Sequence, residues 1–191
     1  MASVKGTATE LNLLKSFAGE SQARNRYTYF ASVAKKEGYE QISAIFTETA
    51  DNEKEHAKVF FKYLEGGDTE ITATYPAGRI GTTAENLAAA AAGEKEEWSV
   101  LYPAFADQAA ADGFADIADS YRQIAEVEAH HEMRYKKLLA NVNGGDVFKR
   151  LLPHKWICRN CGYVFEGAEA PDVCPACKHP QAYFMLLADN F

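Results

Sequence analysis

Two copies of the pattern Glu-x-x-His constrain the fold of this chain more than any other feature: Glu53-x-x-His56 and Glu128-x-x-His131. Each copy falls in the middle of a long helix-favouring stretch. Residues three apart on a helix share one face, so the carboxylate and the imidazole of each copy point the same way. Two helices that face each other with such pairs can hold two metal ions between them. The pattern therefore predicts a helical bundle around a buried pair of ions.

Helix-breaking residues divide most of the chain into four predicted helices. These cover residues 5–37, 40–65, 84–111 and 114–143, and they end at Gly38, Gly66, Gly113 and Gly144. Residues 66–82 predict a long crossover, and Thr82 or Thr83 offers an N-cap to the third helix. Pro103 predicts a kink or local irregularity in that helix. Short, long and short connections give an all-α, ferritin-like four-helix bundle.

Counting residues from the turns places four glutamates at similar heights in this bundle. Glu20 lies about 18 residues before the first turn and Glu53 about 14 after it. Glu97 lies about 16 residues before the last turn and Glu128 about 15 after it. At about 1.5 Å per residue these differences amount to about one helical turn. The four side chains can therefore meet at one level.

These acids lie on apolar helix stripes, which indicates a buried setting. Burying an ionised carboxylate costs several kcal/mol unless it is paired or bound to metal. Carboxylates and imidazoles suit iron or manganese better than metals that prefer thiolates. The predicted ligands are Glu20, Glu53, His56, Glu94, Glu97, Glu128 and His131.

Two tyrosines lie near the predicted ligands. Tyr27 follows Glu20 by seven residues and Tyr102 follows Glu94 by eight, so each lies on the helix face of that carboxylate. We expect both phenols to donate a hydrogen bond to a ligand carboxylate. Core packing is the alternative role.

Four cysteines form a second metal-binding pattern. Cys158-x-x-Cys161 and Cys174-x-x-Cys177 are separated by 12 residues, and four thiolates at this spacing make a closed tetrahedral site for iron or zinc. The glycine after Cys161 and the proline after Cys174 suit tight turns around a metal. A segment of about 38 residues is too small to fold without such a metal. A structural zinc ribbon is the alternative to an iron site.

Composition limits the classes of function. The chain has 191 residues, a formal net charge of −7 and a pI near 5.3, which argues against a general binder of nucleic acid or of anionic membranes. No apolar run reaches the length of a membrane span, and the first residues lack the apolar stretch of a signal peptide. The cysteines all belong to the two close pairs, so none is left for disulfides. We expect a cytoplasmic protein.

Across the whole chain these motifs resemble the rubrerythrin family. The glutamate and histidine pattern and the four cysteines match the family in order. The resemblance implies a di-iron bundle over residues 1–146, a linker over 147–153 and a β-rich, rubredoxin-like Fe(Cys)4 domain over 154–191. Three iron ions per subunit follow from it, with zinc able to replace iron.

The resemblance also implies an activity. Members of the family are typically cytoplasmic enzymes of anaerobic or air-sensitive microbes that reduce hydrogen peroxide to water. It implies a head-to-tail homodimer, in which one subunit's Fe(Cys)4 site reloads the other's di-iron site. The expected donor is a small rubredoxin with its reduced-nicotinamide-linked reductase. His56 and Glu97 are expected to exchange at one iron, and Glu97, Tyr27 and Tyr102 are candidates for proton delivery.

Three other functions compete with the peroxidase. A ferritin-type protein oxidises iron as its substrate, but this role does not require the one-electron site that the cysteines offer. A non-catalytic module with a zinc ribbon would be colourless, whereas ferric Fe(Cys)4 is red. A di-iron oxygenase needs an organic substrate pocket, which the sequence does not specify.

Overall fold

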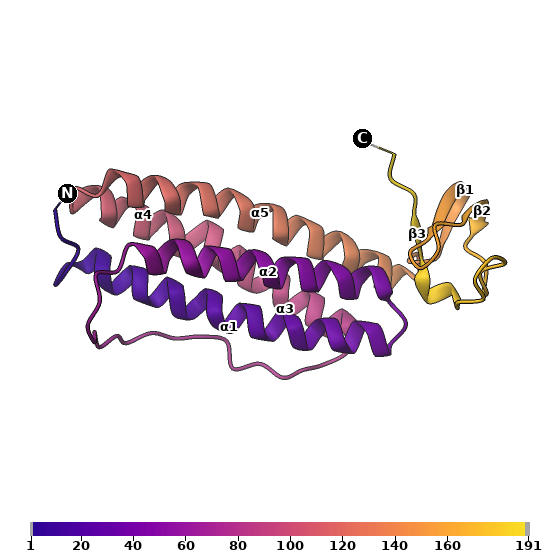
Figure 1. Cartoon of the computed structure of the whole chain (residues 1–191), viewed down its shortest axis with the longest axis horizontal. Coiled ribbons are helices and arrows are strands. Elements are labelled where there is room, and N and C mark those ends of the chain that lie inside the picture. Colours follow the sequence, from indigo (N-terminus) through magenta and orange to yellow (C-terminus); the bar gives the residue numbers. More distant parts are fainter. Residues whose placement is uncertain (1, 190–191) are drawn as a thin grey trace.

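Four long helices lie side by side in the computed structural model, which describes residues 2–189 (Figure 1). The elements are α1 (Ala8–Lys36), α2 (Glu40–Lys62), α3 (Thr83–Glu96), the π-helical segment η1 (Glu97–Leu101), α4 (Tyr102–Ala111) and α5 (Ala115–Gly144). The elements α3, η1 and α4 together make the third predicted helix. No helix within residues 2–189 is long and apolar enough to cross a bilayer.

Local sequence fixes where the helices begin and end. The Thr7 side chain accepts a hydrogen bond from the backbone N–H of Glu10 at the start of α1. Thr82 and Glu85 form a reciprocal capping box at the start of α3, which confirms the predicted N-cap. Gly113, between α4 and α5, has a φ of 87°, a conformation that favours glycine.

The predicted irregularity of the third helix takes the form of a π-helical turn. The segment η1 begins at Glu97 and ends just before the first turn of α4, where Pro103 lies. Proline has no N–H to donate and its ring crowds the preceding turn, so the helix widens there instead of continuing regularly. The widened turn therefore starts at a predicted ligand.

The long crossover runs along the outer side of α1 (Figure 1). The Tyr75 hydroxyl donates a hydrogen bond of 2.8 Å to the carbonyl oxygen of Lys15. Gly19 lies under the Tyr75 ring, where an added Cβ would be 3.6 Å from a ring carbon. These contacts fix the crossover against α1. The bounds of the helices confirm the short, long, short connectivity.

Two buried apolar clusters make up the bundle core. One contains Phe46, Leu87 and Tyr135, and the other contains Phe60 and Tyr121. In sequence the predicted metal ligands fall between the two sets on every helix. The ligand layer is therefore enclosed by apolar side chains along the bundle axis.

A small antiparallel sheet follows α5. Its strands are β1 (Lys149–Cys158), β2 (Val164–Glu169) and β3 (Phe184–Leu186), in the order β2-β1-β3. Trp156 is fully buried at its centre. Because β1 begins at Lys149, strand structure extends into the segment 147–153 that we expected to be a linker. The domain boundaries themselves stay a prediction.

The sheet lies at the end of the bundle beside the α1–α2 turn (Figure 1). The rings of Tyr39 and Phe148 stack there, with centroids 6.1 Å apart and planes at 10°. Glu53 is 13 residues beyond the start of α2 at Glu40, which corresponds to about 20 Å along the helix. The sheet and the middle of the bundle are thus well separated within one chain.

Candidate metal centres

Six of the seven predicted bundle ligands converge in the middle of the bundle. They form two groups, in each of which one ligand atom per residue lies within 4.8 Å of the others: Glu20, Glu53, His56 and Glu128, and Glu53, Glu94, Glu128 and His131. Glu53 and Glu128 belong to both groups. Their two oxygens therefore allow each of them to bridge a pair of ions.

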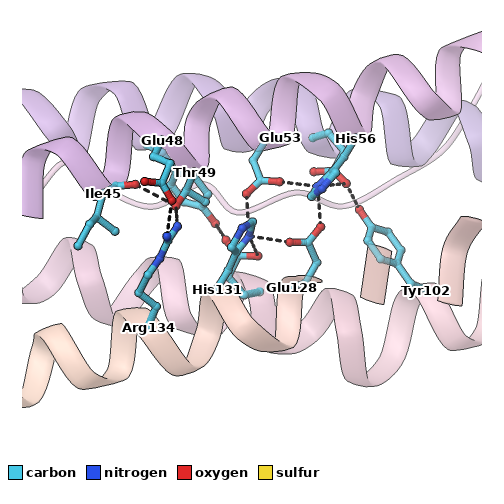
Figure 2. A network of polar contacts seen from close by, with 12 residues as sticks. Ile45, Glu48, Thr49, Glu53, His56, Tyr102, Glu128, His131 and Arg134 are labelled. Atoms are coloured by element: carbon cyan, nitrogen blue, oxygen red, sulfur yellow. Dashed lines mark hydrogen bonds and ion pairs between the residues drawn. The ribbon is translucent and has the colours of Figure 1, made fainter. Parts of the chain in front are cut away.

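The two imidazoles lie across from each other with the shared carboxylates between them (Figure 2). His56 Nδ1 is 2.9 Å from Glu53 Oε2 and 2.8 Å from Glu128 Oε1. His131 Nδ1 is 3.3 Å from Glu53 Oε1 and 2.8 Å from Glu128 Oε2. Both Glu-x-x-His copies thus act as predicted, each presenting a carboxylate and an imidazole to the same point.

Several buried atoms in this layer that could bind a metal ion converge without forming hydrogen bonds to one another. The atoms without a hydrogen bond are Glu20 Oε2, Glu53 Oε1, Glu94 Oε2, both oxygens of Glu128, and His131 Nδ1. The short approaches to His131 bring opposite charges together but lack hydrogen-bond geometry. An unsatisfied buried polar group costs about 1–3 kcal/mol, so the cluster is unfavourable without cations. The donor set fits two iron ions.

Protonation takes over part of the cationic role when no metal is bound. Burial by itself lowers the pKa of both imidazoles, but contacts with Glu128 and Glu53 raise the pKa of His56 to about 10 and that of His131 to about 12. Burial and the charge of Glu53 raise the pKa of Glu94 to about 8. Burial also opposes ionisation of Glu128, yet the two histidines lower its pKa to about 2.

The two tyrosines donate hydrogen bonds to ligand carboxylates, but across the bundle. Tyr27 donates to Glu94 Oε1 at 2.5 Å, and Tyr102 donates to Glu20 Oε1. The predicted hydrogen bond from each phenol to a ligand carboxylate is confirmed, although the sequence spacing did not specify that the partner lies on another helix. Each phenol reaches over to the neighbouring helix, because a long side chain on a buried stripe points toward the facing helix.

Replacing Tyr102 with phenylalanine is expected to weaken iron binding by the Glu20 group about 10–100-fold, because partners that orient ligands contribute this much to affinity. Competition with a chelator measures the effect. Tyr121→Phe is the matched control, since the Tyr121 hydroxyl lies 3.1 Å from Ser16 Oγ rather than on a ligand. Equal iron affinity in the Tyr102 variant and the wild type would contradict this role.

Glu97 lies beside the two groups and belongs to neither. It is half-buried at the first position of η1. Burial, followed by the charges of Glu94, Glu128 and Glu53, raises the pKa of Glu97 well above its usual value, and Arg26 opposes this shift. Glu97 as a ligand therefore stays a prediction.

The sequence reasoning missed a polar connection next to the ligands. Arg134 on α5 donates hydrogen bonds to Glu48 Oε1 at 2.5 Å and to Thr49 Oγ1 at 2.6 Å on α2 (Figure 2). Arg134 follows His131 by three residues and Thr49 precedes Glu53 by four, so both share the ligands' faces. That spacing is the signal that could have found them. The connection holds α2 and α5 together one turn from the site.

The four cysteines converge as predicted. One sulfur of each lies within 4.8 Å of the others, and two Sγ–Sγ distances are both 3.7 Å, between Cys158 and Cys177 and between Cys161 and Cys174. A disulfide needs about 2.05 Å. A tetrahedral ion with sulfur bonds of about 2.3 Å holds its sulfurs about 3.8 Å apart. The spacing therefore fits a single Fe(Cys)4 ion.

Two turns present backbone N–H groups to these sulfurs. The backbone N–H of His179 and the neighbouring thiols lower the pKa of Cys177 to about 6. Gly162 and Lys178 each lie in the turn directly after the second cysteine of a pair. Both have positive φ, at 78° and 64°. The glycine was predicted, whereas the non-glycine residue Lys178 in the second turn was not.

The family models match both parts of the chain. The model for rubrerythrin matches residues 12–139, and the model for the rubredoxin-like domain of rubrerythrin matches residues 156–185. A rubrerythrin of Porphyromonas gingivalis is 64% identical over 189 residues, covering 99% of this chain and 94% of that protein. A rubrerythrin of Nitratidesulfovibrio vulgaris is 55% identical over 191 residues and is covered completely, as is this chain.

The fold is similar to that of a solved relative. The fully reduced, all-ferrous state of nigerythrin has a TM-score of 0.63 and 28% identity, and the match covers 97% of this chain and 92% of that one. The family and the two donor sets together account for three iron ions per subunit, two in the bundle and one on the cysteines. The chain is thus an iron-binding oxidoreductase and belongs to the rubrerythrin family.

Proposed function

We propose that this protein is a peroxidase that reduces hydrogen peroxide to two waters with two electrons and two protons, in the cytoplasm, as protection against oxidative stress. The observation that carries the proposal is a two-ion carboxylate site and a one-electron cysteine site on one chain. When iron is bound, the bundle pair supplies the two electrons that one peroxide consumes, and Fe(Cys)4 restores them singly. A rubredoxin with its reductase is the proposed donor.

Glu97 and His56 are proposed to alternate at the Glu20 group. His56 lies in that group and Glu97 lies outside it. A second carboxylate compensates the higher positive charge of the oxidised site better than a neutral imidazole does. Glu97 therefore enters on oxidation and His56 replaces it on reduction.

Glu97 is also the proposed proton carrier. Its raised pKa lets it hold a proton when it is not a ligand, and its half-buried position gives it access to water. Burial raises the pKa of Tyr27 and of Tyr102 well above the usual value. Both phenols consequently keep their protons and orient Glu94 and Glu20 as hydrogen-bond donors.

Replacing Glu97 with alanine is expected to reduce peroxide turnover at least about 100-fold, the usual contribution of a general acid or base. Steady-state turnover with a reduced rubredoxin measures it. Glu96→Ala, which removes an exposed neighbour, serves as the control and should keep full activity. Unchanged turnover in the Glu97 variant would remove Glu97 from the mechanism.

The proposed assembly is a head-to-tail homodimer. The sheet of one chain lies at the bundle end, about 20 Å or more from Glu53, and electron transfer slows exponentially with distance. A partner's sheet placed beside the site would shorten this path. Leu151 and Leu152 are exposed by 102% and 71%, and such apolar surface favours a contact between chains.

Anaerobic mixing of the reduced, iron-loaded protein with oxidant tests the proposed reaction. We expect the bundle iron to be oxidised by one equivalent of hydrogen peroxide much faster than by dioxygen, with no net iron uptake over repeated cycles. Comparable rates with both oxidants would remove the preference for peroxide. Net iron uptake would identify a ferritin-type activity instead.

A further inference from the structure

A cavity of about 730 Å³ lies between α1, the crossover and α3, outside the ligand layer. This size lies within the usual range of about 300–1,000 Å³ for small-molecule sites. The residues that could contact a ligand there include Gln22, Asn25, Arg26, Tyr29, Arg79 and Ile80. None of them is a predicted metal ligand.

Two arginines in this cavity form no hydrogen bond or ion pair among the described residues, although the Arg26 guanidinium lies over the Tyr27 ring, 5.7 Å from its centroid. Neither Arg26 nor Arg79 forms a side-chain hydrogen bond or an ion pair within residues 2–189, and Arg26 Nε is buried without a partner. The chain has 27 acidic and 20 basic residues, so pairing would be the ordinary outcome. Glu96 is the one acid in the lining, and it forms no ion pair with either arginine. Arg79 is therefore available to an anion, and Arg26, whose charge also acts on Glu97, can contribute a second guanidinium.

A glycine of α3 lies beside Arg26. Gly93 lies inside α3, where glycine costs about 1 kcal/mol relative to alanine. A Cβ added at Gly93 would lie 3.7 Å from Arg26 Nη2 and 4.0 Å from the Tyr27 hydroxyl. These are ordinary contact distances, so the Arg26 guanidinium packs against α3 whether or not residue 93 has a side chain. The opposite wall is fixed by the Tyr75 hydrogen bond to α1.

The rest of the lining suits a flat organic group. Tyr29 is exposed by 50% and Ile80 by 58%, so a planar ring can pack against them. The amides of Gln22 and Asn25 can donate and accept hydrogen bonds at its edge. Guanidinium groups bind phosphate with paired hydrogen bonds. We propose that this cavity binds a nucleoside phosphate, with its phosphate on Arg26 and Arg79 and its base on Tyr29 and Ile80. The proposal does not depend on the peroxidase reaction.

Calorimetric titration of the iron-loaded protein with AMP, adenosine and inorganic phosphate tests this site. We expect AMP to bind more tightly than either part alone. Arg79→Gln should weaken AMP binding at least tenfold, and Tyr29→Ala should weaken AMP binding but not phosphate binding. Arg122→Gln, which removes an arginine paired with Asp119 on α5, should bind AMP like the wild type. Iron content reports that each variant is folded.

Three results would overturn the assignment. The first is no heat of binding with AMP at millimolar concentration. The second is AMP binding that Arg79→Gln leaves unchanged, which would place the nucleotide elsewhere. The third is equal affinity for AMP and inorganic phosphate together with no effect of Tyr29→Ala, which would reduce the cavity to a simple oxyanion site. A protein that does not turn over peroxide would still give the same results in these binding measurements.

Discussion

Replacing Glu128 with glutamine is expected to remove both iron ions from the bundle and to leave the cysteine site loaded. Glu128 belongs to both ligand groups, and an amide has neither the charge nor the second anionic oxygen needed to bridge two cations. Iron content should fall from three ions per subunit to about one. The red colour of Fe(Cys)4 should remain while peroxide turnover is lost.

Metal analysis and the visible spectrum measure this result on one sample. Glu126→Gln is the matched control, because Glu126 lies on the same helix and is exposed. It should retain all three ions. A Glu128 variant that still holds two bundle ions would show that the shared carboxylate does not bridge them.

Removing the bundle metal is expected to give a protein whose stability falls as pH rises from about 5 to about 9. Glu94 has a folded-state pKa of about 8 against an ordinary value of 4.5, so the folded state holds a proton that the unfolded chain loses through this range. The pKa values of His56 and His131 are raised to about 10 and about 12. Both histidines therefore also make the folded state less stable as pH rises above their ordinary pKa of 6.5. The stability that a raised folded-state pKa contributes at low pH is lost as pH increases.

The size of this effect should be large. One pKa unit corresponds to about 1.4 kcal/mol, so the combined loss is on the order of several kcal/mol. For a chain of this length this is a fall of roughly 10 °C or more in Tm. Below about pH 4.5 the trend reverses. Glu128 has a folded-state pKa lowered to about 2, so the unfolded chain takes up a proton first and the folded state loses stability as pH falls.

Thermal unfolding of metal-free and iron-loaded protein across this range measures the effect. The iron-loaded protein should vary far less above neutral pH, because the ions take the place of the protons. His131→Gln in the metal-free state should flatten part of the alkaline slope. A metal-free Tm that is constant between about pH 6 and about pH 9 would contradict the assigned proton positions.

The bundle and its ligand layer could be predicted because both follow from spacing along helices. Glu20 and Glu53 meet because residues counted from one turn fix their height, and Glu53 and His56 point together because they are three apart. Such regularities need no knowledge of side-chain conformation. The same holds for the cysteine pairs, whose spacing is local.

What the sequence did not provide depends on contacts between helices. The sequence predicted that both tyrosines would bind a ligand carboxylate but not which one, and Tyr27 binds Glu94 and Tyr102 binds Glu20 across the bundle. Pro103 predicted an irregularity but not its π-helical form in η1, and the start of β1 at Lys149 depends on what packs around it. Helical periodicity carries no information on either. The connection from Arg134 to α2 was missed for the same reason.

The crossover gives the metal layer an internal symmetry. The α1–α2 hairpin before the crossover supplies one glutamate, one Glu-x-x-His pair and one tyrosine. The elements α3–α5 after it supply the same set. Each half offers its tyrosine to the other half's glutamate. The centre therefore has the composition of two equivalent hairpins facing each other about a two-fold axis. A pair of such hairpins could form the same centre without the crossover, which makes this bundle the single-chain equivalent of a dimer of half-sized chains.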